Sequence, residues 1–326
     1  LSLLRFAFPT IAMMIFMGLY TIVDTIFVAR FVNEYALSAI NIVCPIINIT
    51  VGLGTMLATG GNAIIARKMG SGMVREAKEN FTLLIIAGTA MGILITLIGL
   101  SCLSPIIYKL GASNLLYPYC RDYLLIILLF IPANILQTLF QNLFVTAGKP
   151  GIGFTVSILA GAANIIFDYI FIVLLYMGFA GAGLGTGIGY SLPAITGLFY
   201  FARSNGSLSF CSPKLDLKVL SESCFNGASE MIGQLATAIT TLLFNHTMMS
   251  LIGENGVAAI TIIIYSQFLL STLYIGYSMG VAPIIGYNYG SKNTTQQKAI
   301  FRICIGFILA VSFTVFFVCL LGSRFM

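Results

Sequence analysis

The sequence predicts an all-α protein that crosses a membrane many times. Of its 326 residues, 59% are hydrophobic and only 8% are charged. A soluble domain carries roughly 25% charged residues, so this chain has too few to cover a surface that faces water. It also contains repeated apolar runs of about 20 residues, each long enough to cross a hydrocarbon core of roughly 30 Å.

These apolar runs predict nine membrane-spanning helices. The runs are too long for barrel strands, and they lack the two-residue alternation of a lipid-facing barrel. The first run is not a cleavable signal peptide, because it is long, contains an acid and precedes no small-residue cleavage site. We place the helices at residues 5–29, 36–62, 81–106, 119–145, 151–177, 180–201, 220–249, 256–286 and 300–322.

The basic residues predict the orientation. With the N-terminus in the cytoplasm, twelve Lys and Arg residues lie on the cytoplasmic side and four lie outside, as the positive-inside rule requires. They are spread over several short loops, so the net charge of +6 does not indicate nucleic-acid binding. We expect a multi-pass protein of the cell membrane (inner or plasma membrane) with a cytoplasmic N-terminus.

An internal repeat predicts two lobes of parallel six-helix units. Residues 34–78 match residues 254–298 without gaps at an offset of 220, with eleven identical pairs that include Gly60/Gly280 and Gly70/Gly290. Six helices separate the copies, so both run in the same direction, an arrangement used by alternating-access transporters. We expect lobes at 1–203 and 204–326, joined by a polar linker within 202–218. Because the second copy stops after its third helix, we expect six plus three helices here, with three more missing.

No enzyme or cofactor site is expected. The seven cysteines are scattered, and no Cys-x-x-Cys or His pairing suggests a metal. Cysteine is commonly a small buried hydrophobe. The sequence also contains no nucleophile–base cluster, which counts against a membrane enzyme.

Two acids lie deep within predicted spans at similar heights. Asp24 falls in the outer half of the first helix and Asp168 at a matching depth in the fifth. Tyr20 precedes Asp24 by four residues, and Asn164 precedes Asp168 by four, so each pair shares one helical face. In the sixth helix, which descends from outside, Thr186 reaches the same level.

This cluster fits a cation site better than a purely structural contact. Polar side chains do hydrogen-bond across spanning helices, for about 0.6 kcal/mol each, and Asn, Tyr and Thr alone would fit that reading. Each acid, however, costs roughly 2.5–3.5 kcal/mol to insert. Two converging carboxylates would favour binding of a proton at Asp24 and Asp168.

A third acid is ambiguous. Glu230 lies in the inner half of the seventh helix, and Gln234 follows one turn later. The two could form a second-lobe cation site or a substrate contact. Alternatively, Glu230 could be a capped acid that faces the cytoplasm.

Three segments resemble the multidrug and toxic compound extrusion (MATE) transporters. They are "VDTIFVARFVNEYALSAI" (23–40), "AGKPGIGFTVSILAGAANIIFDYIFI" (147–172) and "GFAGAGLGTGIGYS" (178–191). The resemblance implies a six-plus-six repeat and an N-lobe network that couples transport to protons or sodium. The matching positions are Tyr20, Asp24, Asn164, Asp168 and Thr186. Glu230 does not clearly align with the family's glutamate on the seventh helix, where Ser229 stands in place of a common proline.

The resemblance implies a secondary antiporter. It would act as a monomer without a cofactor and export amphipathic, cationic organic compounds in exchange for H⁺ or Na⁺. The alternative is a lipid-linked oligosaccharide flippase of the same superfamily, which should favour basic residues in its cavity, whereas the intramembrane charges here are acidic. A non-transporting scaffold would not need paired acids in the bilayer.

Overall fold

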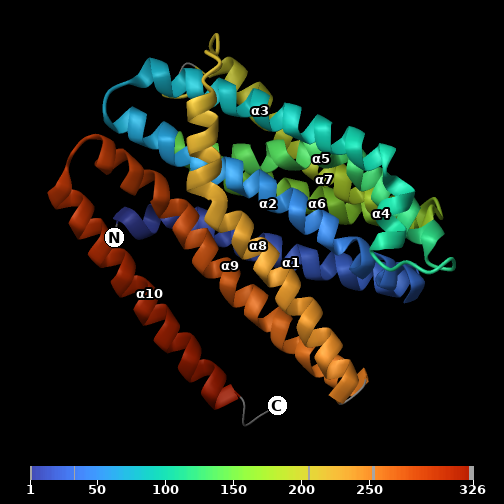
Figure 1. Cartoon of the computed structure of the whole chain (residues 1–326). Coiled ribbons are helices and arrows are strands. Elements are labelled where there is room, and N and C mark those ends of the chain that lie inside the picture. Colours follow the sequence, from blue (N-terminus) through green and yellow to red (C-terminus); the bar gives the residue numbers. More distant parts are fainter. Residues whose placement is uncertain (1, 33, 205, 252–253, 323–326) are drawn as a thin grey trace.

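The protein is almost entirely helical in the computed structural model, which describes residues 2–32, 34–204, 206–251 and 254–322 (Figure 1). Within these ranges the chain forms ten α-helices and one π-helical turn, and it forms no strand. The elements are α1 (Ser2–Phe31), α2 (Glu34–Gly70), α3 (Val74–Ser101), α4 (Leu103–Lys109), α5 (Tyr117–Thr146), α6 (Pro150–Asp168), the π-helical turn η1 (Tyr169–Leu174), α7 (Gly178–Arg203), α8 (Leu217–Leu251), α9 (Glu254–Gly290) and α10 (Thr294–Gly322).

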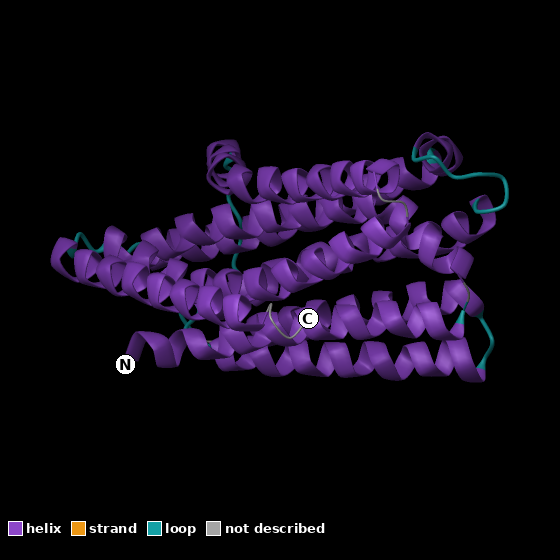
Figure 2. Cartoon of the chain, turned by 90° about the horizontal axis from the view of Figure 1, so that it is seen from below, coloured by secondary structure: helices purple, strands orange, loops and turns teal. Residues whose placement is uncertain are grey.

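The predicted all-α membrane fold is confirmed. Among the described residues, six helices are long and apolar enough to cross a bilayer: α1, α2, α3, α5, α6 with η1, and α10. The other long helices, α7 to α9, occupy the positions of the remaining predicted spans. Figure 2 shows that short loops join these helices.

Several helices extend beyond the predicted bounds. α2 continues to Gly70 and α3 begins at Val74, so Glu76 and Glu79, which the apolar runs place in a loop, lie in a helix. Arg75 Nε donates to Glu79 Oε1 at 3.3 Å, and the Glu79 side chain is buried. Hydropathy marks only the apolar part of a helix, and paired charges continue it beyond that part.

The N-terminal helices share one apolar core. α5 lies at its centre and contacts α2, α3, α6 and α7. Four phenylalanines are almost fully buried there, and three of them, Phe81, Phe140 and Phe144, contact the ring of the fourth, Phe201. This core holds α6 and α7 in fixed positions.

The segment between α7 and α8 is bound to the N-terminal helices. Leu208 is buried, and the Cys211 N–H donates to Thr82 Oγ1 at 3.1 Å. Lys214 Nζ lies 4.0 Å from Glu79 Oε2. The end of this segment therefore lies against α3 before α8 begins.

The helices after this segment contact α1 and α2. α2 packs on α8 and α9, α1 packs on α9, and α10 packs mainly on α9 at the edge of the molecule (Figure 1). Glycines permit these contacts: a Cβ atom at Gly60 would overlap the Ser223 carbonyl of α8, and one at Gly227 would overlap the Met56 carbonyl of α2.

The closest contact between the two repeat copies is reciprocal. A Cβ at Gly70 would overlap the carbonyl oxygen of Tyr287, and a Cβ at Gly290 would overlap that of Arg67. Both pairs, Gly70/Gly290 and Arg67/Tyr287, are separated by the repeat offset of 220 residues. These four residues, the α2–α9 crossing, therefore form a contact with two-fold pseudosymmetry, in which backbone meets backbone.

Candidate functional site

Glycines in α7 bring that helix against two polar residues of α6. A Cβ atom at Gly185 would overlap Asp168 Oδ1, and one at Gly189 would lie 3.2 Å from Asn164 Cβ. Asp168 and Asn164 are each 1% exposed. The alternating glycines of "GAGLGTGIG" thus give the space that a buried carboxylate and amide require.

A glycine in α6 brings α1 to the same place. A Cβ at Gly161 would lie 2.7 Å from Phe16 Cε1 and 3.3 Å from Tyr20 Cδ1. The face of α1 that carries Tyr20 therefore lies against α6, and Asp24 follows one turn later on that face.

Asp24 and Asp168 face each other between α1 and α6. Their carboxyl groups interact electrostatically and lie within hydrogen-bonding reach of each other. In the described part of the chain, no donor bonds to Asp24 Oδ1 or to either oxygen of Asp168. Two carboxylates have no hydrogen of their own to share, so they can bond to each other only when one carries a proton.

The remaining predicted site residues add further unpaired oxygens. Asn164 Oδ1 and Thr186 Oγ1 are buried and have no hydrogen-bond partner among the described residues. Buried polar groups are nearly always paired, with a proton, water, ion or protein atom. With the three carboxyl oxygens, five oxygen atoms from three helices are thus available to a proton or to a small hard cation.

Sequence reasoning missed two tyrosines near the acid pair. Tyr190 of α7 interacts with Asp24 and Tyr20, and Asn134 of α5 lies near its hydroxyl. Tyr123 of α5 also interacts with both acids. Tyr190 follows Thr186 by four residues, so the spacing rule that identified the other pairs would have found it.

The helix changes geometry directly after Asp168. η1 replaces α-helix over Tyr169–Leu174, and the Leu175 N–H donates to the Ile170 carbonyl, five residues back, at 2.9 Å. Such π-helical turns are rare and often lie at functional sites. This wide turn ends the helix immediately beyond the carboxylate.

Glu230 and Gln234 lie apart from the acid pair. Both are on α8, and the Glu230 side chain is exposed. Gln234 packs against Gly52 of α2: a Cβ added at Gly52 would lie 3.5 Å from Gln234 Cβ. The structure brings together Tyr20, Asp24, Asn164 and Asp168, and Thr186 follows Gly185, which contacts Asp168. It does not bring Glu230 or Gln234 to them. In the described residues, no group of three or more His, Cys, Asp or Glu could hold a metal ion.

An all-helical membrane fold with acids buried between its spans defines a transporter class, since ionisable residues inside a bilayer mark ion and substrate pathways. The family model MatE matches residues 9–170 and 231–326, more than half of the chain. The chain therefore belongs to the MatE family of membrane transporters.

Similar proteins agree with this assignment. The multidrug export protein MepA of Staphylococcus haemolyticus (strain JCSC1435) is 27% identical over 318 residues, which cover 96% of this chain and 70% of that protein. A crystal structure of MATE in complex with MaD3S has a TM-score of 0.92 at 20% identity and covers 99% of this chain and 73% of that one.

A second solved structure has the same fold. It is the outward-facing conformation of a multidrug resistance MATE family transporter of the MOP superfamily, with a TM-score of 0.92 at 19% identity. It covers 99% of this chain and 72% of that chain. At these identities the solved structures establish the fold, and they confirm the predicted all-helical membrane fold.

Proposed function

We propose that this protein is a secondary antiporter that exports amphipathic, cationic organic compounds in exchange for H⁺ or Na⁺. The observation that carries the proposal is the Asp24–Asp168 pair. Two carboxyl groups face each other inside the bilayer, and no described residue donates a hydrogen bond to Asp168. A buried pair of like charges is costly unless a cation accompanies it, so this site favours cation binding.

The oxygen atoms around the pair support either coupling ion. A proton would be shared between Asp24 and Asp168. Na⁺ would use oxygens of the same carboxyl groups, with Asn164 Oδ1 and Thr186 Oγ1 available as neutral ligands. Tyr20 and Tyr190 would then close the site toward α5 and α7.

Cation binding would act on the equilibrium between two conformations. We place the lobes at 1–203 and 204–326 and the N-terminus in the cytoplasm, which puts the α2–α9 crossing at the cytoplasmic ends of both helices. The close backbone contact there supports an outward-facing state, closed on the cytoplasmic side. A bound cation shifts this equilibrium only by its difference in affinity for the two states.

The substrate class rests on charge and on the relatives. The two acids buried between the spans, Asp24 and Asp168, favour a cationic compound over the anionic headgroup that a lipid-linked oligosaccharide flippase would carry. The MepA relative is named a multidrug export protein, which supports efflux of varied organic compounds. We propose that the protein acts as a monomer, without a cofactor or catalysis.

Gradient-driven efflux tests the proposal. The protein is reconstituted in proteoliposomes, a proton or a sodium gradient is imposed separately, and efflux of a cationic dye is followed. One gradient should drive efflux, and Asp168→Asn should abolish that coupling. Asp122→Asn removes an exposed acid at the start of α5 and is the matched control, with efflux retained. Normal gradient-driven efflux by Asp168→Asn would contradict the mechanism.

A further inference from the structure

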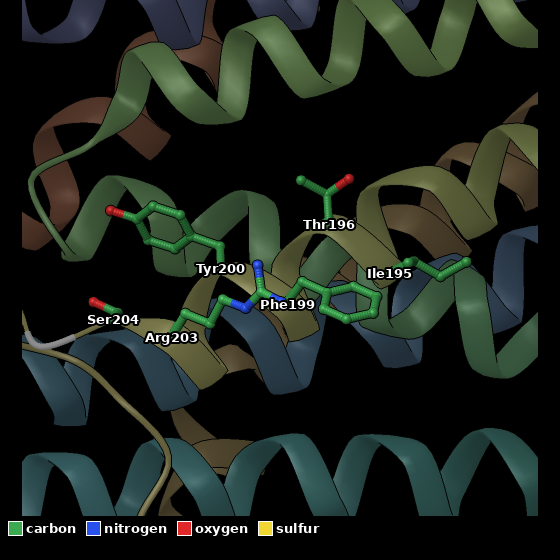
Figure 3. A pocket seen from close by; sticks show the side chains of 6 residues that line it. All are labelled: Ile195, Thr196, Phe199, Tyr200, Arg203 and Ser204. Atoms are coloured by element: carbon green, nitrogen blue, oxygen red, sulfur yellow. The ribbon is translucent and has the colours of Figure 1, made fainter.

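A groove lies at the C-terminal end of α7, well away from the acid pair. It has a volume of about 560 Å³ and is lined by Ile195, Thr196, Phe199, Tyr200, Arg203 and Ser204, which we call the α7 groove. Figure 3 shows Arg203 and Ser204 at one end of the α7 groove and Ile195 at the other. The acid pair contacts the opposite part of the helix, near Gly185.

The α7 groove changes from apolar to polar along the helix. Ile195 and Phe199 are 52% and 60% exposed, and Arg203 and Ser204 follow at the helix end. At 1.5 Å per residue, the distance from Ile195 to Arg203 is about 12 Å. The polar zone on each side of a bilayer is roughly 5–8 Å deep, so the groove reaches from the headgroup layer into the hydrocarbon.

The charge of Arg203 is available to a ligand. Among the described residues, Arg67, Lys68, Arg75 and Lys214 form ion pairs with N–O distances of 3.0–4.0 Å. No described acid lies that close to Arg203. Its guanidinium contacts the Phe199 ring, with Cζ 6.0 Å from the centroid. A guanidinium presents several donors that match the oxygens of a phosphate.

The hydroxyl of Ser204 can assist. Ser204 Oγ accepts a hydrogen bond from the Gly206 N–H at 3.1 Å, so the hydroxyl proton remains free to donate to an anionic oxygen. Tyr200 is fixed at the inner side of the groove by an edge-on contact with Phe144, with ring centroids 5.3 Å apart. The polar end thus offers the donors of Arg203 and Ser204 beside the packed ring of Tyr200.

We propose that the α7 groove binds an anionic phospholipid, with the phosphate at Arg203 and Ser204 and an acyl chain along Ile195 and Phe199. Basic pockets on the cytoplasmic side of spanning helices are suited to such headgroups. A cationic compound would be repelled by Arg203, and a free phosphate would leave the apolar half uncovered. The cytoplasmic leaflet follows from the orientation given under the proposed function.

A fluorescence measurement tests this binding directly. The chain contains no Trp, so Phe199→Trp introduces a single reporter into the groove. The full chain is placed in two kinds of phosphatidylcholine bilayer. One contains brominated phosphatidylglycerol and the other contains brominated phosphatidylcholine. The brominated acyl chains quench tryptophan on contact. We expect half-maximal quenching at about fivefold lower content of the anionic lipid.

Charge variants identify the residue responsible. Arg203→Gln in the reporter background should remove the preference, and Arg203→Lys should keep part of it because the charge remains. Arg75→Gln removes the same charge from a residue already paired with Glu79 and should leave the preference unchanged. Equal quenching by both lipids, or a preference that survives Arg203→Gln, would overturn the proposal.

Two further measurements distinguish a bound phospholipid from free phosphate. Inorganic phosphate should not reverse the quenching; if it does so fully, the site binds free phosphate and the proposal is wrong. Native mass spectrometry of the unmodified chain should show retained phosphatidylglycerol that Arg203→Gln loses, and retention by that variant would also contradict it. Neither measurement uses a gradient or a transported compound, so failure of the antiport proposal would leave these results unaffected.

Discussion

Glycine produces two different kinds of close contact in this molecule. At the acid pair, Gly185 and Gly189 leave space that the side chains of Asp168 and Asn164 occupy. At the α2–α9 crossing, Gly70 and Gly290 instead let the backbone of each helix pack against a carbonyl oxygen of the other. A side chain can rotate or change its partner, whereas a backbone contact can only form or separate. The acid pair is therefore suited to binding and release, and the crossing to an all-or-none closure.

The largest expected effect comes from removing either acid of the pair. If Asp24 and Asp168 act as one unit, Asp24→Asn and Asp168→Asn each reduce gradient-driven dye efflux to background, and the double variant is no worse than either single one. Residues that act together show this non-additive behaviour. If each single variant lost only part of the efflux and the double variant lost the sum of the two, the acids would act independently.

Adding one methyl group to α7 should be nearly as damaging. Gly185→Ala places a Cβ where Asp168 Oδ1 lies, and overpacking of this kind costs roughly 1–3 kcal/mol. We expect about a tenfold loss of gradient-driven efflux, with the protein still folded. Gly233→Ala adds the same group to α8, where no atom lies within 4 Å, and should retain full efflux. Equal activity of the two variants would mean that the fit around Asp168 is unimportant.

A methyl group at the α2–α9 crossing should change conformation rather than cation binding. Gly70→Ala and Gly290→Ala each force a Cβ onto a carbonyl of the other helix. Spin labels at the neighbouring exposed positions Ser71 and Ser291, in a background without the native cysteines, report the separation. Both variants should shift the population toward the longer distance by a similar, severalfold amount, because the contact is reciprocal. An unchanged distance distribution would rule out the crossing as a closure point.

The smallest effect is expected at the nearby ion pair. Arg67 Nη2 lies 3.7 Å from Glu222 Oε2, with side chains 46% and 40% exposed. Such exposed pairs contribute about 0–1 kcal/mol, so Arg67→Gln should leave the spin-label distances almost unchanged. If this variant opened the crossing as far as Gly70→Ala does, the ion pair rather than glycine packing would hold the contact.

The part of the site that the sequence predicts depends on spacing within single helices. The four-residue intervals Tyr20–Asp24 and Asn164–Asp168 place each pair on one face, and depth counting adds Thr186. The structure brings Tyr20, Asp24, Asn164 and Asp168 together, and Thr186 follows Gly185, which contacts Asp168. Whether they couple transport to a cation remains a prediction.

What the sequence does not predict depends on contacts between helices. Tyr123 reaches the acid pair from α5, and no spacing rule relates α5 to α1 or α6. Apolar runs reveal only the buried middle of a helix, so they wrongly place Glu79 in a loop. Glu230 is the ambiguous acid, and its exposed position on α8 gives it no described contact with the pair.

The repeat is informative in a different way. Gly70 and Gly290 are visible in the sequence as an identical pair at a fixed offset. Their mutual contact could not be predicted, because a repeat relates two copies without showing where they touch. The structure shows that this identical pair lies where the copies meet.

The π-helical turn after Asp168 has a consequence for insertions and deletions. Each residue of an α-helix rotates the chain by about 100°. Deleting one residue between Pro150 and Gly161 would therefore turn Gly161 and Asp168 together away from α1 if the start of the helix stays in place. Deleting one residue from Tyr169–Leu174 would only convert the wide turn into an ordinary one, with Asp168 still in place. Length changes in this helix should be tolerated on the C-terminal side of Asp168 and rejected on the N-terminal side.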